Sequence, residues 1–293
     1  MKETTLIGYN NLKLYTRVYD NVKKAKAVVQ IIHGMLEHGG RYDRFCQMLE
    51  SNGYIVIITD LRGHGKTSES FEKLGHGEKD IFGECVEDQI KVSEYIKENY
   101  NLPLYIFAHS WGSMIAQEYL QKCHLAEKVV LCGTTNGNNS MFKLGKFLSA
   151  IISFFCGKKT PAKLISNVNN NLYQKGFEDG NWLSRDYNIW EEYKKDPYTK
   201  AMFPLSFYRS LFSHMTKVNK GIENIKKDTS ILLIVGSKDP VSEQSKQVTK
   251  LYNIYKKHNL DVQLKIYEDA RHELINETNK EEVDNDILTF YKI

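Results

Sequence analysis

The chain has 293 residues, 41% of them hydrophobic and 12% aromatic, and its 40 basic and 36 acidic residues leave a net charge of +4 at pH 7. Such a composition is typical of a globular protein with a substantial core, and the length fits one large α/β domain or two smaller ones. The charge is too small, and the lysines too widely spread, to indicate nucleic-acid binding, so we expect no nucleic-acid partner.

Strands and helices are expected to alternate along the first 132 residues. The runs AVVQII and YIVIIT show no polar alternation and are typical of strands that are covered on both faces. Hydrophobic periodicity places helices between such strands. The expected order is strand 4–7, strand 12–19, strand 27–32, helix 41–52, strand 54–59, helix 81–98, strand 104–108, helix 111–121 and strand 128–132.

The alternation resumes late in the chain, with strand 231–235, helix 243–258, strand 262–267 and helix 281–291. It predicts an α/β fold with one mostly parallel sheet and helices on both faces. The intervening segment, 135–228, breaks the rhythm and contains the apolar stretch MFKLGKFLSAIISFFC. A long insertion in an α/β sheet usually forms its own layer or lid. We therefore expect a core made of 1–134 and 229–293, with 135–228 as an inserted helical cap.

The stretch FAHSWGS, Phe107 to Ser113, places a serine between an expected strand and an expected helix. The residues two before and two after this serine are small, Ala108 and Gly112, as is needed where strand and helix backbones approach closely. Glycine usually occupies the first of these positions, so Ala108 is a departure that adds one methyl group. This context predicts that Ser110 is a nucleophile, and a serine that caps a helix is the alternative.

A serine hydroxyl becomes an effective nucleophile only when a base accepts its proton. In folds of this kind the chain order is serine, then acid, then histidine. His272 and Asp239 each follow an expected strand in the second half of the chain. We therefore expect His272 to act as the base and Asp239 to orient it. Glu268 and Asp269, close to the histidine, are the rival acids.

Attack on an ester creates an oxyanion, which requires two preorganised backbone donors. The N–H of Trp111, directly after the serine, is expected to be one of them. The N–H of Met35 is expected to be the other, because His33 and Gly34 let the loop after strand 27–32 turn inward. A glycine turn without this role is the alternative interpretation.

Motifs for other ligands are incomplete. DLRGHGKTS resembles part of a phosphate loop but lacks its spacing, and no Gly-x-Gly-x-x-Gly follows the first strand. The histidines and cysteines show no metal-binding spacing, so we expect no cofactor and no metal. The odd number of cysteines argues against a disulfide framework. We expect five buried thiols: Cys46, Cys85, Cys123, Cys132 and Cys156.

The sequence also bears on location. The first 20 residues contain no apolar signal-peptide core. No run approaches the roughly 18 apolar residues of a membrane-spanning helix. We expect a cytoplasmic protein, and its oligomeric state stays open.

Five motifs, HGMLEHGGRY, DLRGHGKTS, AHSWGS, GSKDPVS and ARHE, occur in this order. Together they resemble the α/β-hydrolases of the monoacylglycerol lipase and lysophospholipase type, from about Val28 to the C-terminus. The resemblance implies an α/β-hydrolase fold and a serine hydrolase that acts on lipid esters. It also implies that Glu37 and Arg41 shape the polar end of the substrate pocket. A salt-bridged helix start explains these two residues equally well, so both interpretations stay open.

The resemblance makes 135–228 the cap of a lipase. Its apolar residues fit an acyl tunnel or a membrane surface, while plain packing of the cap on the core is the simpler interpretation. We expect hydrolysis of single-chain lipid esters, monoacylglycerol or lysophospholipid, through an acyl-enzyme intermediate. A short-chain carboxylesterase, a peptidase and a non-catalytic membrane-associated binding protein are the alternatives. The apolar residues of the cap that fit a tunnel or a membrane surface are Phe142, Leu144, Phe147, Leu148, Ile151, Ile152, Phe154 and Phe155.

Overall fold

The computed structural model describes residues 1–292, without the side chains of residues 169 and 170. Within this part of the chain, eight strands form one sheet in the order β1-β2-β4-β3-β5-β6-β7-β8. The β1–β2 and β2–β4 pairs are antiparallel, and the other five pairs are parallel. The mostly parallel sheet is therefore confirmed. The strands are β1 (Lys2–Ile7), β2 (Lys13–Tyr19), β3 (Ala27–Ile32), β4 (Tyr54–Thr59), β5 (Leu104–His109), β6 (Ala126–Cys132), β7 (Ser230–Gly236) and β8 (Val262–Tyr267).

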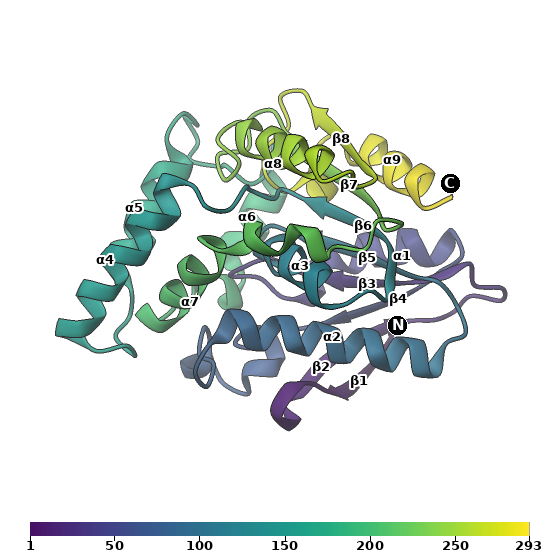
Figure 1. Cartoon of the computed structure of the whole chain (residues 1–293), viewed down its shortest axis with the longest axis horizontal. Helices are drawn as coiled ribbons and strands as arrows, with labels where there is room; N and C mark the ends of the chain where they lie inside the picture. The colour runs from purple at the N-terminus through teal and green to yellow at the C-terminus, as the bar shows by residue number, and fades with distance from the viewer. Residues whose placement is uncertain (293) are drawn as a thin grey trace.

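Helices cover both faces of the sheet (Figure 1). Neighbouring strand residues bury their side chains on opposite faces: Val28 packs into the cluster that contains α2, α3 and α8, and Val29 packs into the cluster that contains α1 and α9. This two-sided burial is why the central strands are apolar throughout. The helices are α1 (Asp43–Ser51), α2 (Ile81–Asn99), α3 (Trp111–Lys122), α8 (Lys246–Lys257) and α9 (Lys280–Lys292).

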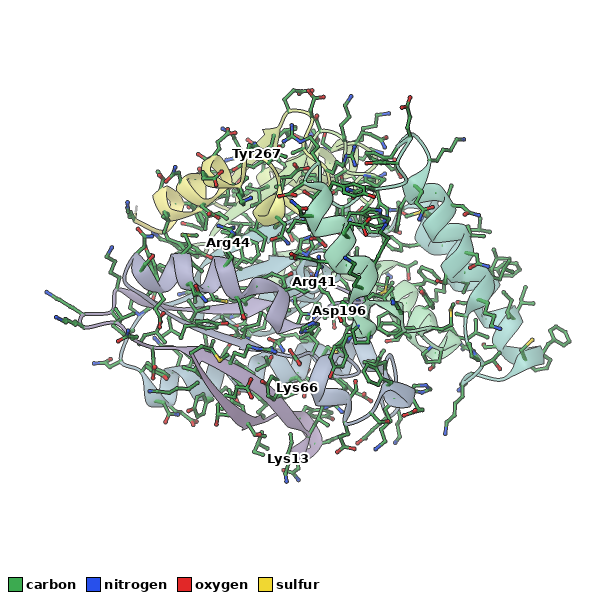
Figure 2. All side chains as sticks on the ribbon, turned by 180° about the vertical axis from the view of Figure 1, so that it is seen from behind. Lys13, Arg41, Arg44, Lys66, Asp196 and Tyr267 are labelled. Atoms are coloured by element: carbon green, nitrogen blue, oxygen red, sulfur yellow. The ribbon has the colours of Figure 1, made fainter. Side chains whose placement is uncertain are left out.

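Side-chain contacts also join α1 to the C-terminal helix on its face of the sheet. Arg44, labelled in Figure 2, donates to the carbonyl of Ile275 at 2.6 Å and to both carboxylate oxygens of Asp284 in α9, at 2.5 and 3.2 Å. The loop that carries His272 lies directly before these partners in the chain. The contacts therefore fix the far end of that loop to the core.

The helix expected over 243–258 begins late, at Lys246. Three successive residues before it, Glu243, Gln244 and Ser245, have φ angles of 53°, 52° and 65°. This left-handed region is unfavourable for side-chain-bearing residues and does not continue a right-handed helix. The prediction was wrong at this end because the loop after β7 remains a tight turn, and Asp239 lies at its beginning.

Residues 135–228 contain four α-helices and lie apart from the regular strand–helix alternation. In Figure 1, α4 and α5 lie at one end of the molecule, and α4 packs along α7. We propose that this segment is the cap, on a core of 1–134 and 229–292; residue 293 lies outside the described residues. Its helices are α4 (Ser140–Cys156), α5 (Lys163–Gln174), α6 (Tyr187–Lys195) and α7 (Leu205–Met215).

An ion cluster fastens α7 to two helices of the core. His214 pairs through Nδ1 with Glu118 of α3 at 2.5 Å and through Nε2 with Asp80, the residue before α2, at 2.7 Å. Burial alone would lower the pKa of His214, but the two carboxylates outweigh burial and raise it to about 9. Burial alone would raise the pKa of Asp80, but its hydrogen bonds with His214 and Ser210 outweigh burial and lower it to about 2. At neutral pH the imidazolium therefore donates to both core helices at once.

The expectation that all five cysteines are buried was wrong for one of them. Four of them are buried free thiols, but Cys156 is exposed. It is the last residue of α4, next to Phe154 and Phe155, whose side chains are also exposed. The last three residues of α4 are therefore exposed, so an apolar sequence did not imply burial. Throughout residues 1–292, no helix combines the length and the apolarity needed to cross a bilayer.

Candidate active site

The predicted serine turn has the backbone geometry of a sharp elbow. Ser110 joins β5 to α3 with φ 52° and ψ −121°, outside the regions that residues with a Cβ normally occupy. A Cβ at Gly112 would lie 2.3 Å from the carbonyl oxygen of Ile32 and 2.4 Å from that of His33. Only glycine fits there, because α3 packs directly on the end of β3. The elbow therefore projects the serine side chain from the edge of the sheet.

The three residues predicted to form a catalytic relay lie within hydrogen-bond reach of one another. His272 Nε2 lies 2.8 Å from Ser110 Oγ, and His272 Nδ1 lies 2.9 Å from Asp239 Oδ1. They come from the loops after β5, β7 and β8, which meet at the carboxyl edge of the sheet. The side chains of His272 and Asp239 are buried. The arrangement can pass a proton from the serine to the imidazole and stabilise the imidazolium.

The surroundings of Asp239 fix the orientation of the imidazole. Its Oδ1 accepts from the backbone N–H of Val241 at 2.9 Å as well as facing His272. The N–H of Gln244 closes the turn by donating to the carbonyl of Asp239 at 2.8 Å. An ionised carboxylate only accepts hydrogen bonds, so Nδ1 carries the proton and Nε2 is free to accept one from Ser110. This is the tautomer that a general base needs.

The loop with the expected oxyanion donor is held by a buried histidine. His33 Nδ1 donates to the carbonyl of Gly34 at 2.8 Å, and its Nε2 accepts from the N–H of Leu61 at 2.9 Å. This pattern requires a neutral ring, and burial lowers the pKa of His33 in agreement with it. Met35 follows directly and lines the same cavity as Ser110 and Trp111.

Trp111 is the first residue of α3, and the first N–H groups of a helix have no acceptor within that helix. Its amide therefore adjoins the nucleophile at the N-terminal end of a helix, where partial positive charge collects. The role of both amides as oxyanion donors stays a prediction.

Glu37, expected near the polar end of the pocket, lies in a buried hydrogen-bond network. Its carboxylate accepts from the N–H of Gly34, from the hydroxyl of Tyr42 at 2.8 Å and from His109 at 3.1 Å. Burial opposes ionisation of Glu37, but His109 and the charge of Arg41 outweigh burial and hold its pKa below the ordinary value. The carboxylate thus fixes the conformation of the loop after β3.

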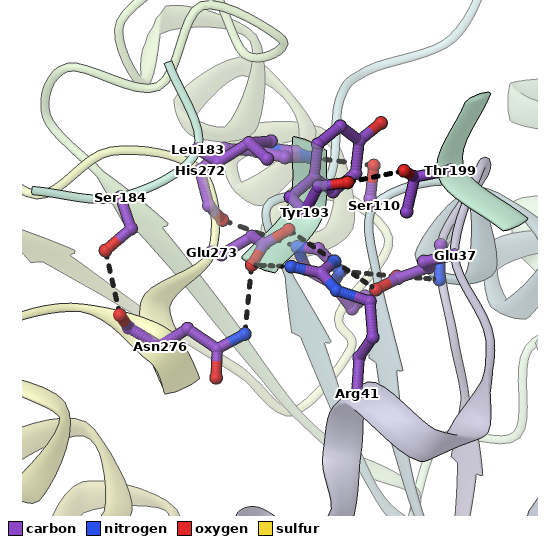
Figure 3. A network of polar contacts seen from close by, with 12 residues as sticks. Glu37, Arg41, Ser110, Leu183, Ser184, Tyr193, Thr199, His272, Glu273 and Asn276 are labelled. Atoms are coloured by element: carbon purple, nitrogen blue, oxygen red, sulfur yellow. Dashed lines mark hydrogen bonds and ion pairs between the residues drawn. The ribbon is translucent and has the colours of Figure 1, made fainter. Parts of the chain in front are cut away.

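Arg41 donates at 3.0 Å to Glu37 and forms two further bonds, of 2.7 and 2.9 Å, to the carboxylate of Glu273 (Figure 3). The ring of Tyr193, from α6, covers its guanidinium at 5.0 Å. Arg41 and Glu37 therefore form the salt bridge that the sequence left open as one interpretation. Their role in substrate binding stays a prediction.

Sequence reasoning missed Glu273 and Glu277. Glu273 directly follows the predicted base in the motif RHE, and this adjacency was the one signal available. Its ion-pair partner, Arg41, is 232 residues away in the chain. Glu277 is fully buried and receives hydrogen bonds from Arg185, in the segment 135–228, and no local pattern marks it.

A mainly apolar cavity of about 350 Å³ opens beside Ser110. Its walls combine the loops after β3 and β5 with side chains from α4, α5 and α7. The described residues that line it include no charged side chain. The cavity suits a hydrocarbon chain, since burial of apolar surface is the main favourable term in such binding. Residues that contribute to the wall are Met114, Leu148, Ile152, Ile165, Leu211 and Phe212.

Of the eight apolar residues singled out in 141–156, four line this cavity: Phe142, Leu144, Leu148 and Ile152. The other four, Phe147, Ile151, Phe154 and Phe155, are exposed, and Phe154 retains 84% of its accessible surface; Leu144 and Leu148 retain 58% and 44% of theirs although they line the cavity. The two sets alternate at helical spacing along α4. The helix therefore has one apolar face toward the cavity and another toward the solvent.

Known proteins resemble this chain over most of its length. Residues 23–279 match the family described as serine aminopeptidase, S33. The monoglyceride lipase homolog of Monkeypox virus is 27% identical over 288 residues, which cover 96% of this chain and 94% of that protein. Homo sapiens monoglyceride lipase is 27% identical over 273 residues, covering 92% and 82%. A thermostable carboxyl esterase from Bacillus coagulans, crystallised with glycerol, is 25% identical, with a TM-score of 0.89 and coverage of 99% of this chain and 97% of that chain.

Proposed function

The chain belongs to the serine aminopeptidase S33 family of α/β-hydrolases and is a carboxylic ester hydrolase, and on this premise we propose that it cleaves esters of single-chain lipids through an acyl-enzyme intermediate. The substrate is a monoacylglycerol or a lysophospholipid. One observation carries the proposal: the hydrogen-bonded series Ser110–His272–Asp239 opens onto an uncharged apolar cavity.

In the proposed reaction, Ser110 Oγ attacks the ester carbonyl while His272 Nε2 takes its proton. The amides of Met35 and Trp111 stabilise the oxyanion of the tetrahedral intermediate. His272 then protonates the departing alcohol, which leaves the fatty acyl group on Ser110. A water molecule, deprotonated by the same imidazole, releases the fatty acid. In both acylation and deacylation, Asp239 holds the tautomer of His272 and stabilises the imidazolium.

The cavity favours a lipid ester over a peptide. An aminopeptidase must bind the ammonium group of its substrate, and a carboxylate is the usual partner for a buried ammonium. The described residues that line the cavity include no Asp or Glu side chain. A single acyl chain requires no such partner. The peptidase alternative therefore lacks a binding group where it would need one, although the same relay could act on an amide.

Chain-length preference tests the proposed substrate. Each methylene buried in the cavity contributes about 0.8 kcal/mol, or roughly a fourfold gain in kcat/KM, until the cavity is full. We expect kcat/KM to rise steeply from acetyl to decanoyl glycerol and beyond. Ile152→Trp, which fills part of the wall, should lower the long-chain values and leave acetyl glycerol almost unchanged.

Phe155→Trp is the matched control, because Phe155 lies on the same helix but is 79% exposed. Its chain-length profile, measured below the critical micelle concentration of each ester, should equal that of the wild type. A clear wild-type preference for acetyl glycerol would rule out the lipid substrate and leave a short-chain esterase.

We also propose that the cap makes peripheral contact with an anionic membrane. Around the exposed residues of α4, the segment 136–177 contains six lysines and no Asp or Glu. Apolar side chains that enter a bilayer, surrounded by lysines, suit an anionic lipid surface. The lysines are Lys143, Lys146, Lys158, Lys159, Lys163 and Lys175.

Co-sedimentation with phosphatidylserine-containing vesicles tests this contact. The double variant Phe154→Ser, Phe155→Ser should lose most binding. Phe71→Ser should retain it, because Phe71 is 52% exposed but lies in the segment 1–134, outside the proposed cap. Equal binding by all three proteins would contradict the contact. Binding that is also unaffected by replacing phosphatidylserine with phosphatidylcholine would contradict its charge dependence.

A further inference from the structure

A fully buried carboxylate connects the proposed cap to the loop of the proposed general base. Glu277 Oε1 accepts from the backbone N–H of Arg271, the residue before His272, at 2.7 Å. The same oxygen accepts from the backbone N–H of Arg185 at 3.1 Å, and Oε2 accepts from Arg185 Nε at 2.9 Å. Oε2 also accepts from the N–H of Thr278 at 2.9 Å. One side chain thus bonds to the cap and to the residue next to the imidazole.

Two further hydrogen bonds, at Leu183 and Ser184, join the segment 181–185 to the chain after His272. The N–H of Glu273 donates to the carbonyl of Leu183 at 2.7 Å, and Ser184 Oγ donates to the carbonyl of Asn276 at 2.8 Å (Figure 3). Both contacts join the cap to residues shortly after His272. The histidine loop is therefore bonded to the cap on both sides of the imidazole.

The segment 181–185 also reaches the reacting groups directly. The ring of Trp182 lies 5.2 Å from the ring of His272, and the carbonyl of Trp182 is 3.4 Å from the N–H of the histidine. Trp182 lines the acyl cavity together with Tyr173, whose ring packs against it at 4.9 Å. A displacement of this segment would therefore change the cavity wall and the position of the imidazole together.

We propose that Glu277 is a positioning residue that locks the cap segment 181–185 and His272 into one unit, so that the base is aligned only when this part of the cap is docked. This role rests on the proposed function, in which His272 takes the proton of Ser110. Misplacement of a reacting group by about 1 Å can cost up to 10²-fold in rate. Glu277 touches neither substrate nor nucleophile, so it acts through the histidine.

Glu277→Gln tests the role with little change in volume. The new NH₂ group replaces one carboxylate oxygen and faces two N–H donors, so in either orientation of the amide one of the two hydrogen bonds from Arg185 is lost. The measurement is the second-order rate constant for labelling by a small fluorophosphonate, which needs the base but does not fill the acyl cavity. We expect a decrease of at least 10-fold, and a comparable decrease in kcat for short and long esters alike. A purely structural change of the cavity wall would instead raise KM for long chains only.

Arg185→Ala removes the cap side of the connection while leaving Glu277 and Arg271 in place. It should slow labelling about threefold, and the double variant should be no slower than Glu277→Gln alone, because the two residues act through one contact. Glu282→Gln is the matched control, since it removes the same charge from a side chain that is 52% exposed. Its labelling rate should equal that of the wild type.

The outcomes separate the two proposals. A wild-type protein that takes no label would overturn the proposed function and the role of Glu277 with it. Labelling of the wild type and of a folded Glu277→Gln protein at equal rates would overturn the role of Glu277 alone. Should Glu277→Gln fail to melt cooperatively, Arg185→Ala decides, and a wild-type labelling rate for that variant overturns the coupling.

Discussion

Replacing Ser110 with alanine is expected to lower kcat for monoacylglycerol hydrolysis by about 10⁴- to 10⁶-fold. In relays of this kind, loss of the nucleophile costs about as much as loss of the entire group, because the members act as one unit. The residual rate comes from the oxyanion donors and from substrate binding. Release of free fatty acid under saturating substrate, followed for hours at high enzyme concentration, measures the loss.

Ser113→Ala is the matched control for this variant. Ser113 is buried one turn further along α3, and its hydroxyl donates to the carbonyl of Ser110 and not to His272. We expect its kcat to stay within about threefold of the wild type, and the melting temperatures of both variants to show that the fold is kept. A Ser110→Ala protein with more than about a hundredth of wild-type activity would show that another group performs the attack.

Asp239→Asn should lower kcat by about 10⁴-fold with a small change in KM. An asparagine that presents its NH₂ group to Nδ1 forces the proton onto Nε2, and the imidazole can then no longer accept the proton of Ser110. The shape of the site is kept, so substrate still binds. Steady-state kinetics over a range of ester concentrations separate the two parameters.

The rival acid provides the control. Asp269 is exposed and lies 3.9 Å from Lys238, whereas the two imidazole nitrogens of His272 pair with Asp239 and Ser110. Asp269→Asn should therefore leave kcat unchanged. If Asp269→Asn lowered kcat and Asp239→Asn left it unchanged, the assignment of the acid would be wrong, although the proposed nucleophile and base would still stand.

The sheet could be predicted closely because its strands are buried on both faces. β3 and β4 begin and end where the sequence places them, since a continuous apolar run admits few other environments. The serine turn could be predicted as well, because α3 and the end of β3 approach so closely that only glycine fits at position 112. Such features depend on residues that are close together in the chain, so a single sequence is enough to recognise them.

Contacts between distant residues could not be predicted. The pairing of Arg41 with Glu273 and that of Arg185 with Glu277 join segments 232 and 92 residues apart, and no local pattern announces either. The late start of α8 had a different, local cause: hydrogen bonds within the turn after Asp239 hold three residues at positive φ. There the turn overrides the helical pattern of the sequence.

The sequence also did not settle the environment of the apolar stretch in α4. Its composition was compatible with a tunnel, a membrane surface or plain packing, and the structure divides it between two faces. Leu148 and Ile152 line the cavity, whereas Phe154 and Phe155 face the solvent. Hydrophobicity alone does not reveal which neighbour covers a residue; only the position of α7 and α5 around the helix does.

The central claim is that Ser110 is made nucleophilic by His272 and Asp239. Mass spectrometry of the protein after reaction with a fluorophosphonate tests it most directly, followed by digestion and sequencing of the peptide that spans β5 and α3. The account predicts one phosphonyl group per chain, attached to Ser110, and none in the His272→Ala protein over the same time. A phosphonyl group on any other residue, or undiminished labelling without the imidazole, would contradict it.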